Sequence, residues 1–294
     1  FCVHSGNSIL STGNYNVVVG DEAGTSITTG DYNTAIGYNA LATEDEHGKN
    51  VAVGFQALLS QNAGTDAFNI AVGYEAGAAI TTGTNNTIIG GLAGDALTDA
   101  DYNVALGYAA LSTDTLGSLS VAIGASALLN QNFTSATNAY NVAVGTNAGL
   151  NVTTGIQNTL IGGLAGDDIT TGDNNVSVGY ASLSKATTAD NNTAVGRGAL
   201  SEATTGAGNT GVGKGALEYN TTASDNTAVG HVALFANTTG ANNTTVGGNS
   251  LQANTTGASN TSIGKGALAS NTTASNNTAV GFESLVSNTT GAYN

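Results

Sequence analysis

The chain has 294 residues, of which 42 are glycine, and it contains no proline, methionine or tryptophan. Only 9% of the residues are charged, and the formal net charge is −15. This charge repels nucleic acid and anionic lipid, so we expect no nucleic-acid partner. No apolar run reaches the roughly 18 residues of a membrane-spanning helix, so we also expect no membrane insertion.

The first 15 residues do not contain a complete copy of the pattern that follows, and we expect residues 1–15 to form an N-terminal edge or cap. Cys2 is the one cysteine and has no partner for an internal disulfide. A chain that begins Phe1-Cys2-Val3 and lacks methionine suggests a piece of a longer polypeptide. We expect residues 16–294 to form a repeat shaft of about 16 coils that continues beyond this piece.

From Asn16 onward, one motif recurs at a fixed interval. Each copy has a stretch of the type Asn-Thr-Ala-Val-Gly, whose last residue is here called the anchor glycine. Successive anchor glycines are 17 residues apart, except for 19 residues after Gly54 and 21 after Gly124. Such a period indicates one structural unit per repeat, stacked along an axis. The anchor glycines are Gly20, Gly37, Gly54, Gly73, Gly90, Gly107, Gly124, Gly145, Gly162, Gly179, Gly196, Gly213, Gly230, Gly247, Gly264 and Gly281.

We number each coil so that the anchor glycine is position 5, and we name each coil by that glycine. Position 1 is Asn in every coil except one, where it is Ser120; position 2 is Val, Ile or Thr, and position 4 is Val, Ile or Leu. Positions 2 and 4 share a face in a strand because side chains alternate. The pattern predicts a short strand ended by glycine, with residues such as Val195 and Val212 in a core.

In every coil, either position 9 or position 12 carries a large aliphatic residue, and never both; this pattern is here called the exchange. Position 9 is Leu in eleven coils, such as Leu200 and Leu217, and position 12 is then Asn, Gln, Glu, Asp or Ala. Position 9 is Gly in the other five coils, and position 12 is then aliphatic. The exchange predicts one apolar slot per coil, because an empty slot would cost roughly 2–5 kcal/mol. The aliphatic residues at position 12 are Ile27, Ile80, Leu97, Val152 and Ile169.

The rest of each coil, typically Asn-Thr-Thr-Gly-Ala, is turn sequence, since Asn and Gly tolerate left-handed backbone. Equal residues in adjacent coils are expected to form ladders in which Asn side chains bind one another. A coil of 17 residues supplies few large apolar groups, whereas ordering each residue costs roughly 1–2 kcal/mol of backbone entropy. We therefore expect three chains to share one axial core, with positions 2 and 4 facing the axis.

The stretches Asn-Val-Ala-Val-Gly at 50–54 and Ser-Val-Ala-Ile-Gly at 120–124 resemble coils in the heads of trimeric autotransporter adhesins, which are left-handed parallel β-rolls. The fuller pattern Asn-Thr-Ala-Val-Gly-x-x-Ala-Leu-x-x-Asn-Thr-Thr-Gly is similar to repeats in bacteriophage tail fibres and related bacterial surface proteins. Such proteins often end in a self-cleaving chaperone domain, which is not present here. The resemblance covers residues 16–294. Autotransporter coils are shorter than 17 residues, which leaves the hand of the coil open.

Two coils contain extra residues, within 59–68 and 129–140, after the same Ala-Leu-Leu element. They are four coils apart, so both should bulge from the same face. Loops on solenoids are often binding sites, and Phe68, Phe133 and Tyr140 are candidates to stack on the sugar rings of a receptor. The alternative is a plain surface insertion. Phe68 and Tyr140 directly precede position 1, where other coils also carry Tyr, and this favours packing for these two.

Other candidate sites are weaker. The acidic groups at 21–22, 44–46 and 167–168 lie at loop positions without a recurring partner, so solvated charge explains them better than a glycosidase pair. The stretches Gly90–Asp95 and Gly162–Asp167 lack the tandem ladder of calcium-binding nonapeptides. The three histidines have neither metal nor triad spacing. We expect no catalytic residue, no metal and no cofactor.

We therefore expect an all-β parallel β-solenoid or β-roll of 17-residue coils, assembled as a homotrimeric fibre, and not an enzyme. The expected function is the shaft of a bacteriophage tail fibre on the virion, which positions a receptor-binding tip. A host glycan or protein would then be bound through a domain outside these residues. The alternative is a bacterial cell-surface adhesin or extracellular filament. An ice-binding solenoid is a further alternative, because Thr recurs at positions 13 and 14, although beside Gly rather than in a Thr-x-Thr strand.

Overall fold

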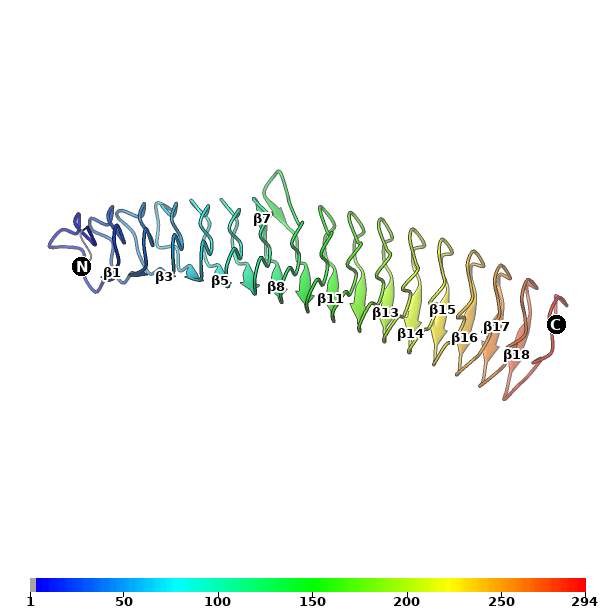
Figure 1. The fold of residues 1–294 in the computed structure, drawn as a ribbon. Helices are drawn as coiled ribbons and strands as arrows, with labels where there is room; N and C mark the ends of the chain where they lie inside the picture. The colour runs from blue at the N-terminus through cyan, green and yellow to red at the C-terminus, as the bar shows by residue number, and fades with distance from the viewer. Residues whose placement is uncertain (1–3) are drawn as a thin grey trace. The chain divides into compact units, whose positions relative to one another are not determined.

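The computed structural model describes residues 4–294 and contains no helix in that range. The chain folds as an all-β parallel β-solenoid of about 16 turns with 17-residue spacing, as predicted (Figure 1). It divides into two compact units, Phe1–Asn147 and Ala148–Asn294, which are built from the same kind of coil. In the expected N-terminal edge, residues 4–15 form turns, and the N–H of Gly6 donates to the carbonyl of Ala23 at 3.0 Å. Cys2 lies outside the described residues.

Each coil contributes one strand of three residues to a parallel sheet, and neighbouring strands pair position for position. For example, Thr193, Ala194 and Val195 pair with Thr210, Gly211 and Val212. In the first unit the strands are β1 (Val17–Val19), β2 (Thr34–Ile36), β3 (Val51–Val53), β4 (Ile70–Val72), β5 (Thr87–Ile89), β6 (Val104–Leu106), β8 (Val121–Ile123) and β10 (Val142–Val144). In the second unit they are β11 (Thr159–Ile161), β12 (Val176–Val178), β13 (Thr193–Val195), β14 (Thr210–Val212), β15 (Thr227–Val229), β16 (Thr244–Val246), β17 (Thr261–Ile263) and β18 (Thr278–Val280).

The strands cover positions 2, 3 and 4, and the middle residue points into the coil. In β13, Ala194 is completely buried, whereas Thr193 and Val195 are half-buried on the outside. Alternation placed positions 2 and 4 on one face, and the small residues of position 3 are the ones that fit inside a narrow coil. The prediction that Val195 and Val212 belong to the core is therefore wrong for the single chain, where both lie on the outer face.

The other predicted core residues lie inside. Leu200 and Leu217 at position 9 are completely buried, and so is the whole aliphatic set at position 12: Ile27, Ile80, Leu97, Val152 and Ile169. Both positions point into the same interior, which is what the exchange in the sequence requires. Position 3 also contributes in some coils with Gly at position 9, where Ile88 and Leu160 replace the usual Ala and are completely buried.

The backbone at position 9 is left-handed in both kinds of coil. The φ angle is +53° at Leu200 and +57° at Gly166. A residue with a Cβ atom pays roughly 1–2 kcal/mol for this conformation, and glycine does not. In coils with Leu, burial of the side chain therefore offsets the backbone strain. Coils with Gly avoid the strain, but a side chain at another position must fill the slot.

The anchor glycine occupies a conformation that other residues do not adopt. Across position 5, φ lies between +126° and +144°, a region that is essentially restricted to glycine. A Cβ atom on Gly213 would also lie 2.4 Å from the carbonyl oxygen of Gly230 in the next coil. Backbone geometry and close stacking together explain why position 5 is glycine in every coil.

Asparagine at position 1 forms a ladder inside the coils. Oδ1 of Asn192 accepts the backbone N–H of Asn209 at 2.9 Å, and Nδ2 of Asn209 donates to the carbonyl of Ala223 at 2.9 Å. A second ladder occupies position 12 of the last coils, where Nδ2 of Asn237 donates to Oδ1 of Asn220 at 2.7 Å. The predicted asparagine ladders are thus confirmed, and they satisfy amides that would be costly to bury unpaired.

Candidate functional site

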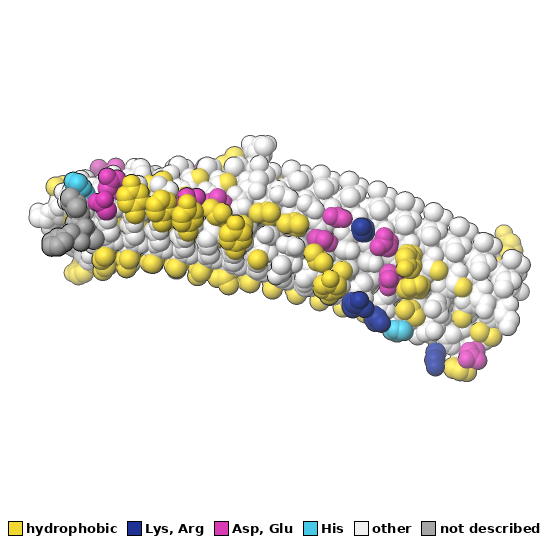
Figure 2. Space-filling view, viewed as in Figure 1, with side chains coloured by type: hydrophobic (Ala, Val, Ile, Leu, Met, Phe, Trp, Pro, Cys, Tyr) yellow, Lys and Arg dark blue, Asp and Glu magenta, His cyan; other side chains and the backbone are white. Residues whose placement is uncertain are grey.

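The outer face of the strands, formed by positions 2 and 4 and here called the outer strand face, has an aliphatic residue at position 4 in every coil and Val, Ile or Thr at position 2. It carries only Val, Ile, Leu and Thr and no charged residue. Among its members, Ile263 is 41% exposed and Val280 is 65% exposed. Figure 2 shows hydrophobic side chains gathered in rows that follow successive coils. Contiguous exposed apolar surface of this kind is typical of an association surface rather than of a free one.

A column of aromatic residues follows the anchor glycines at position 6 in the first unit. The rings of Tyr38 and Phe55 stack at a centroid distance of 5.4 Å, and those of Phe55 and Tyr74 stack at 5.1 Å. The interplanar angles are 20° and 5°. Because each ring covers the face of its neighbour, this column stabilises coil stacking and leaves few ring faces for a ligand.

The three receptor-contact candidates do not form one site. Phe68 and Tyr140 are half exposed and lie at the same position in different coils, and the amino group of Lys49 lies 5.1 Å from the ring centroid of Phe68. The expectation fails for Phe133, which belongs to the second insertion but is only 5% exposed. Phe68 and Tyr140 remain candidates for a receptor contact.

The second insertion is held by a buried carboxylate that sequence reasoning missed. Asp114 is completely buried and accepts the backbone N–H groups of Gly117 and Phe133, each at 3.1 Å, and Nε2 of Gln131 at 2.6 Å. The insertion also forms a short parallel ladder between β7 (Gly117–Ser118) and β9 (Thr137–Asn138), beside the loop that stands out in Figure 1. The available signal was the rare acid at position 12 of the preceding coil.

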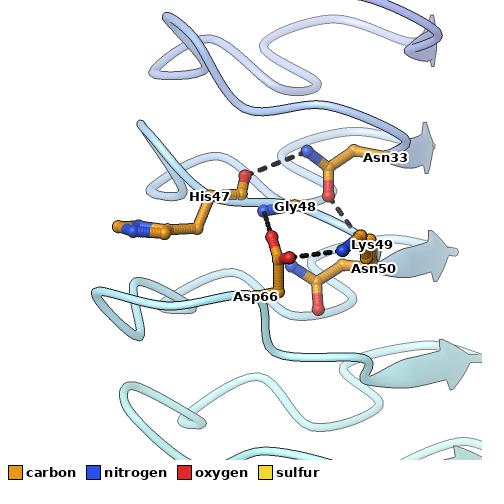
Figure 3. Close-up of polar contacts among 6 residues, drawn as sticks. All are labelled: Asn33, His47, Gly48, Lys49, Asn50 and Asp66. Carbon is orange, nitrogen blue, oxygen red and sulfur yellow. Dashed lines mark hydrogen bonds and ion pairs between the residues drawn. The ribbon is translucent and has the colours of Figure 1, made fainter.

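The first insertion is anchored through Asp66. Its carboxylate accepts the N–H of Gly48 at 3.3 Å and pairs with Nζ of Lys49 at 2.5 Å, as Figure 3 shows. The hydrogen bond from Lys49 lowers the pKa of Asp66. The same figure shows one step of the position 1 ladder, in which Oδ1 of Asn33 accepts the backbone N–H of Asn50 at 3.1 Å while Nδ2 of Asn33 donates to the carbonyl of His47 at 3.2 Å. These contacts give the first insertion a structural role.

One cluster in the described range has the composition of a metal site. Glu44, Asp45 and His47 each offer one ligand atom, and these three atoms lie within 4.8 Å of one another. Glu44 is completely buried, and burial raises the pKa of its carboxyl to about 6. Nδ1 of His47 is buried without a hydrogen-bond partner. Such a mixed O and N set suits zinc or a similar divalent cation, although sequence spacing alone indicated no metal.

The acids in the two glycine-rich stretches do not meet one another. Asp95 and Asp167 both occupy position 10, and one oxygen of each is buried without a hydrogen-bond partner. Burial raises the pKa of both carboxyls, to about 6 for Asp167. They belong to coils separated by three others, so Asp95 and Asp167 do not form a carboxylate pair of the kind that glycoside hydrolysis needs.

No protein-family model matches this chain, and no curated protein matches it at a significant level. Within residues 4–294 there is also no helix with the length and apolar character that crossing a membrane requires.

Proposed function

We propose that this chain is the shaft of a fibrous attachment protein and that three copies assemble through their outer strand faces. The observation that carries this proposal is the aliphatic side chain at position 4 of every coil, which remains half-buried or exposed in the single chain. Covering a Val, Leu or Ile side chain contributes roughly 1.5–3 kcal/mol relative to leaving it exposed. A face of sixteen coils therefore offers a large driving force for association.

The thin interior of each coil supports the same conclusion. Positions 3 and 8 are mostly Ala, position 1 is Asn, and position 9 or 12 supplies the main large apolar side chain. The stabilisation that a small core provides barely exceeds the cost of the conformational entropy that the chain loses on folding. An axial core shared by three chains would add the residues of positions 2 and 4 to the buried set, as the sequence led us to expect.

The similarity of the repeat to those of bacteriophage tail fibres supports a place on the virion, with a receptor-binding tip in another part of the fibre. The alternative is a bacterial surface adhesin or extracellular filament. Immunogold electron microscopy with an antiserum against this chain separates the two. Label on virion tails supports the tail fibre, label on the bacterial envelope supports the adhesin, and label on neither contradicts both.

The mass of the folded protein in solution tests the assembly. We expect analytical ultracentrifugation to give three times the chain mass of 28.7 kDa. Val212→Lys with Val229→Lys places two charges on the outer strand face and should reduce the assembly to single chains. The control pair, Thr205→Lys with Thr222→Lys, adds the same charge at exposed position 14 and should remain trimeric. A wild-type protein that is a stable folded monomer would overturn the proposed assembly.

A second candidate, ice binding, is favoured by one observation. From β13 to β18 the outer strand face carries Thr at position 2 and Val or Ile at position 4, a regular array that is half-buried or exposed. The threonines of position 13 are less suitable, because their hydroxyls are used between coils; Oγ1 of Thr204, for example, donates to the carbonyl of Thr221 at 3.0 Å. A monomer that inhibits ice recrystallisation would favour this function, whereas a trimer without that activity supports the fibre.

A further inference from the structure

A pocket of about 240 Å³ lies on the surface of the second unit, where the Gly179, Gly196 and Gly213 coils follow one another. Its walls come from side chains of positions 6, 10 and 11, and its floor comes from position 7. The residues are thus far apart in sequence and adjacent only because the coils stack. Figure 2 shows Lys, Arg, Asp and Glu side chains gathered on the visible face of the C-terminal half of the chain.

The pocket exists because position 7 is small in three successive coils: Ala181, Gly198 and Gly215. In other coils this position carries larger side chains, such as Leu92 and Leu164, in the same left-handed backbone. A Cβ atom on Gly198 would meet only the carboxylate of Glu218, at 3.6 Å and 3.9 Å. The space above the floor is therefore open, apart from this one acidic group.

The charged groups that line the pocket have no partners among the residues that the structure describes. Arg197 and Lys214 are two of the five basic side chains in the sequence and stand at position 6 of adjacent coils. Glu202 and Glu218 line the same pocket. No side-chain hydrogen bond or ion pair within residues 4–294 involves any of these four side chains, whereas Lys49 does have such a partner in Asp66. Two cationic donor groups and two carboxylate acceptor groups are thus available to a ligand.

An aromatic ring completes the wall. Tyr180 occupies position 6 of the Gly179 coil and is 56% exposed. No ring contact covers it among the described residues, in contrast to the stacked rings of Tyr38 and Phe55. Its ring is therefore available to pack against the C–H surface of a ligand, while its hydroxyl can form hydrogen bonds.

We propose that this pocket binds one sugar ring of a glycan. The volume lies below the roughly 300 Å³ at which pockets for drug-sized ligands begin, which limits the ligand to about one ring. Ser184, Ser201 and the four charged groups match the hydroxyls of a sugar, which both donate and accept. The balance of two positive and two negative groups favours a neutral polyhydroxylated ring over an anion such as phosphate. This gives the proposed shaft a glycan contact of its own, separate from any receptor-binding tip.

Saturation-transfer NMR tests the proposal, with methyl glycosides of glucose, galactose, mannose and N-acetylglucosamine as probes and methyl glucuronide as the anionic comparison. We expect transfer to at least one neutral glycoside. Ala181→Leu should fill the pocket and weaken that binding at least tenfold. Position 7 accepts leucine elsewhere, at Leu92 and Leu164, so this variant should fold, and a thermal melt checks that it does.

Ala109→Leu is the control for the same substitution at position 7 of another coil, and because Ala109 is only 7% exposed, a thermal melt checks that this variant also folds. Ala109 occupies position 7 after Tyr108, has a φ of +52° against +51° at Ala181, and does not line the pocket. The Ala109→Leu variant should leave glycoside binding unchanged. Absence of transfer to every neutral glycoside, preference for the glucuronide alone, or equal loss in both variants would overturn the proposal. Trimer formation is measured separately by mass, so a failure of the sugar site is distinguishable from a failure of the proposed shaft.

Discussion

Cδ1 of Ile169 lies 2.8 Å from the point at which a Cβ atom on Gly166 would stand. The side chain at position 12 therefore occupies the space into which a side chain at position 9 would grow. Cδ2 of Leu160, at position 3, lies 2.7 Å from the same point. One slot is thus filled from position 9 in some coils, and from position 12 with help from position 3 in others.

Leu200→Gly should destabilise the fold by a few kcal/mol, because the cavity costs roughly 2–5 kcal/mol and the relieved left-handed strain returns only about 1–2. Adding Ala203→Ile, at position 12 of the same coil, should recover part of the loss. Adding Ala194→Ile at position 3 should recover more, since Ile88 stands at that position in a coil with Gly at position 9. Thermal melts of the series decide this, and no recovery in either combination would contradict the shared slot.

Two glycines in one strand region should respond very differently to alanine. Gly213→Ala should be strongly destabilising, because φ is +135° and the new Cβ would lie 2.4 Å from the carbonyl oxygen of Gly230. Gly211→Ala should be far milder, since position 3 is Ala in most coils and the new Cβ would meet the carbonyl oxygen of Ala216 at 3.1 Å and Cγ of Leu200 at 3.4 Å, contacts that small shifts relieve. Chemical denaturation measures both. Equal effects would show that close stacking does not select the anchor glycine.

Glu44 should make stability depend on pH. Burial raises the pKa of its carboxyl from 4.5 to about 6, so the folded state prefers the protonated form. Its contribution is fully present below pH 4.5 and is lost as pH rises through about 6, a change of roughly 2 kcal/mol. Glu44→Gln should remove this dependence and stabilise the protein at pH 7.5, as Gln61 and Gln131 occupy position 12 while completely buried.

Exposed Glu46 provides the control for that experiment. Glu46→Gln should leave the denaturation midpoint and its pH dependence unchanged. A Glu44→Gln variant that is less stable than the wild type at pH 7.5 would show that the carboxylate is stabilised in its charged form, for example by a cation held with Asp45 and His47.

Asp114→Ala should loosen the second insertion. It leaves two backbone N–H groups without their acceptor and removes one of the two acceptors of Nε2 of Gln131, which still donates to Oγ of Ser120; the cost is roughly 3 kcal/mol. Protease cleavage within residues 134–136 should become faster. Asp99→Ala removes only an exposed hydrogen bond with Thr82 and should leave the cleavage rate unchanged. Equal rates in both variants would contradict the role given to Asp114.

The coil itself could be predicted from the sequence. A 17-residue period, glycine at every position 5 and the exchange between positions 9 and 12 are repeated constraints, and each repetition strengthens the inference. Leu200 and Ile169 were placed in one interior slot on this basis, and both are completely buried. The period also predicted the asparagine ladders, because equal positions in stacked coils must lie side by side.

Only the tertiary structure decided which face of the strand is inside. Alternation states that Thr193 and Val195 share a face, but not that Ala194 is the residue that fits the interior. The burial of Phe133 and the pocket beside Tyr180 also required the structure. Both arise from contacts between residues of different coils. The geometry of those contacts depends on how backbones and side chains pack in three dimensions, and the repeat in the sequence does not specify this packing.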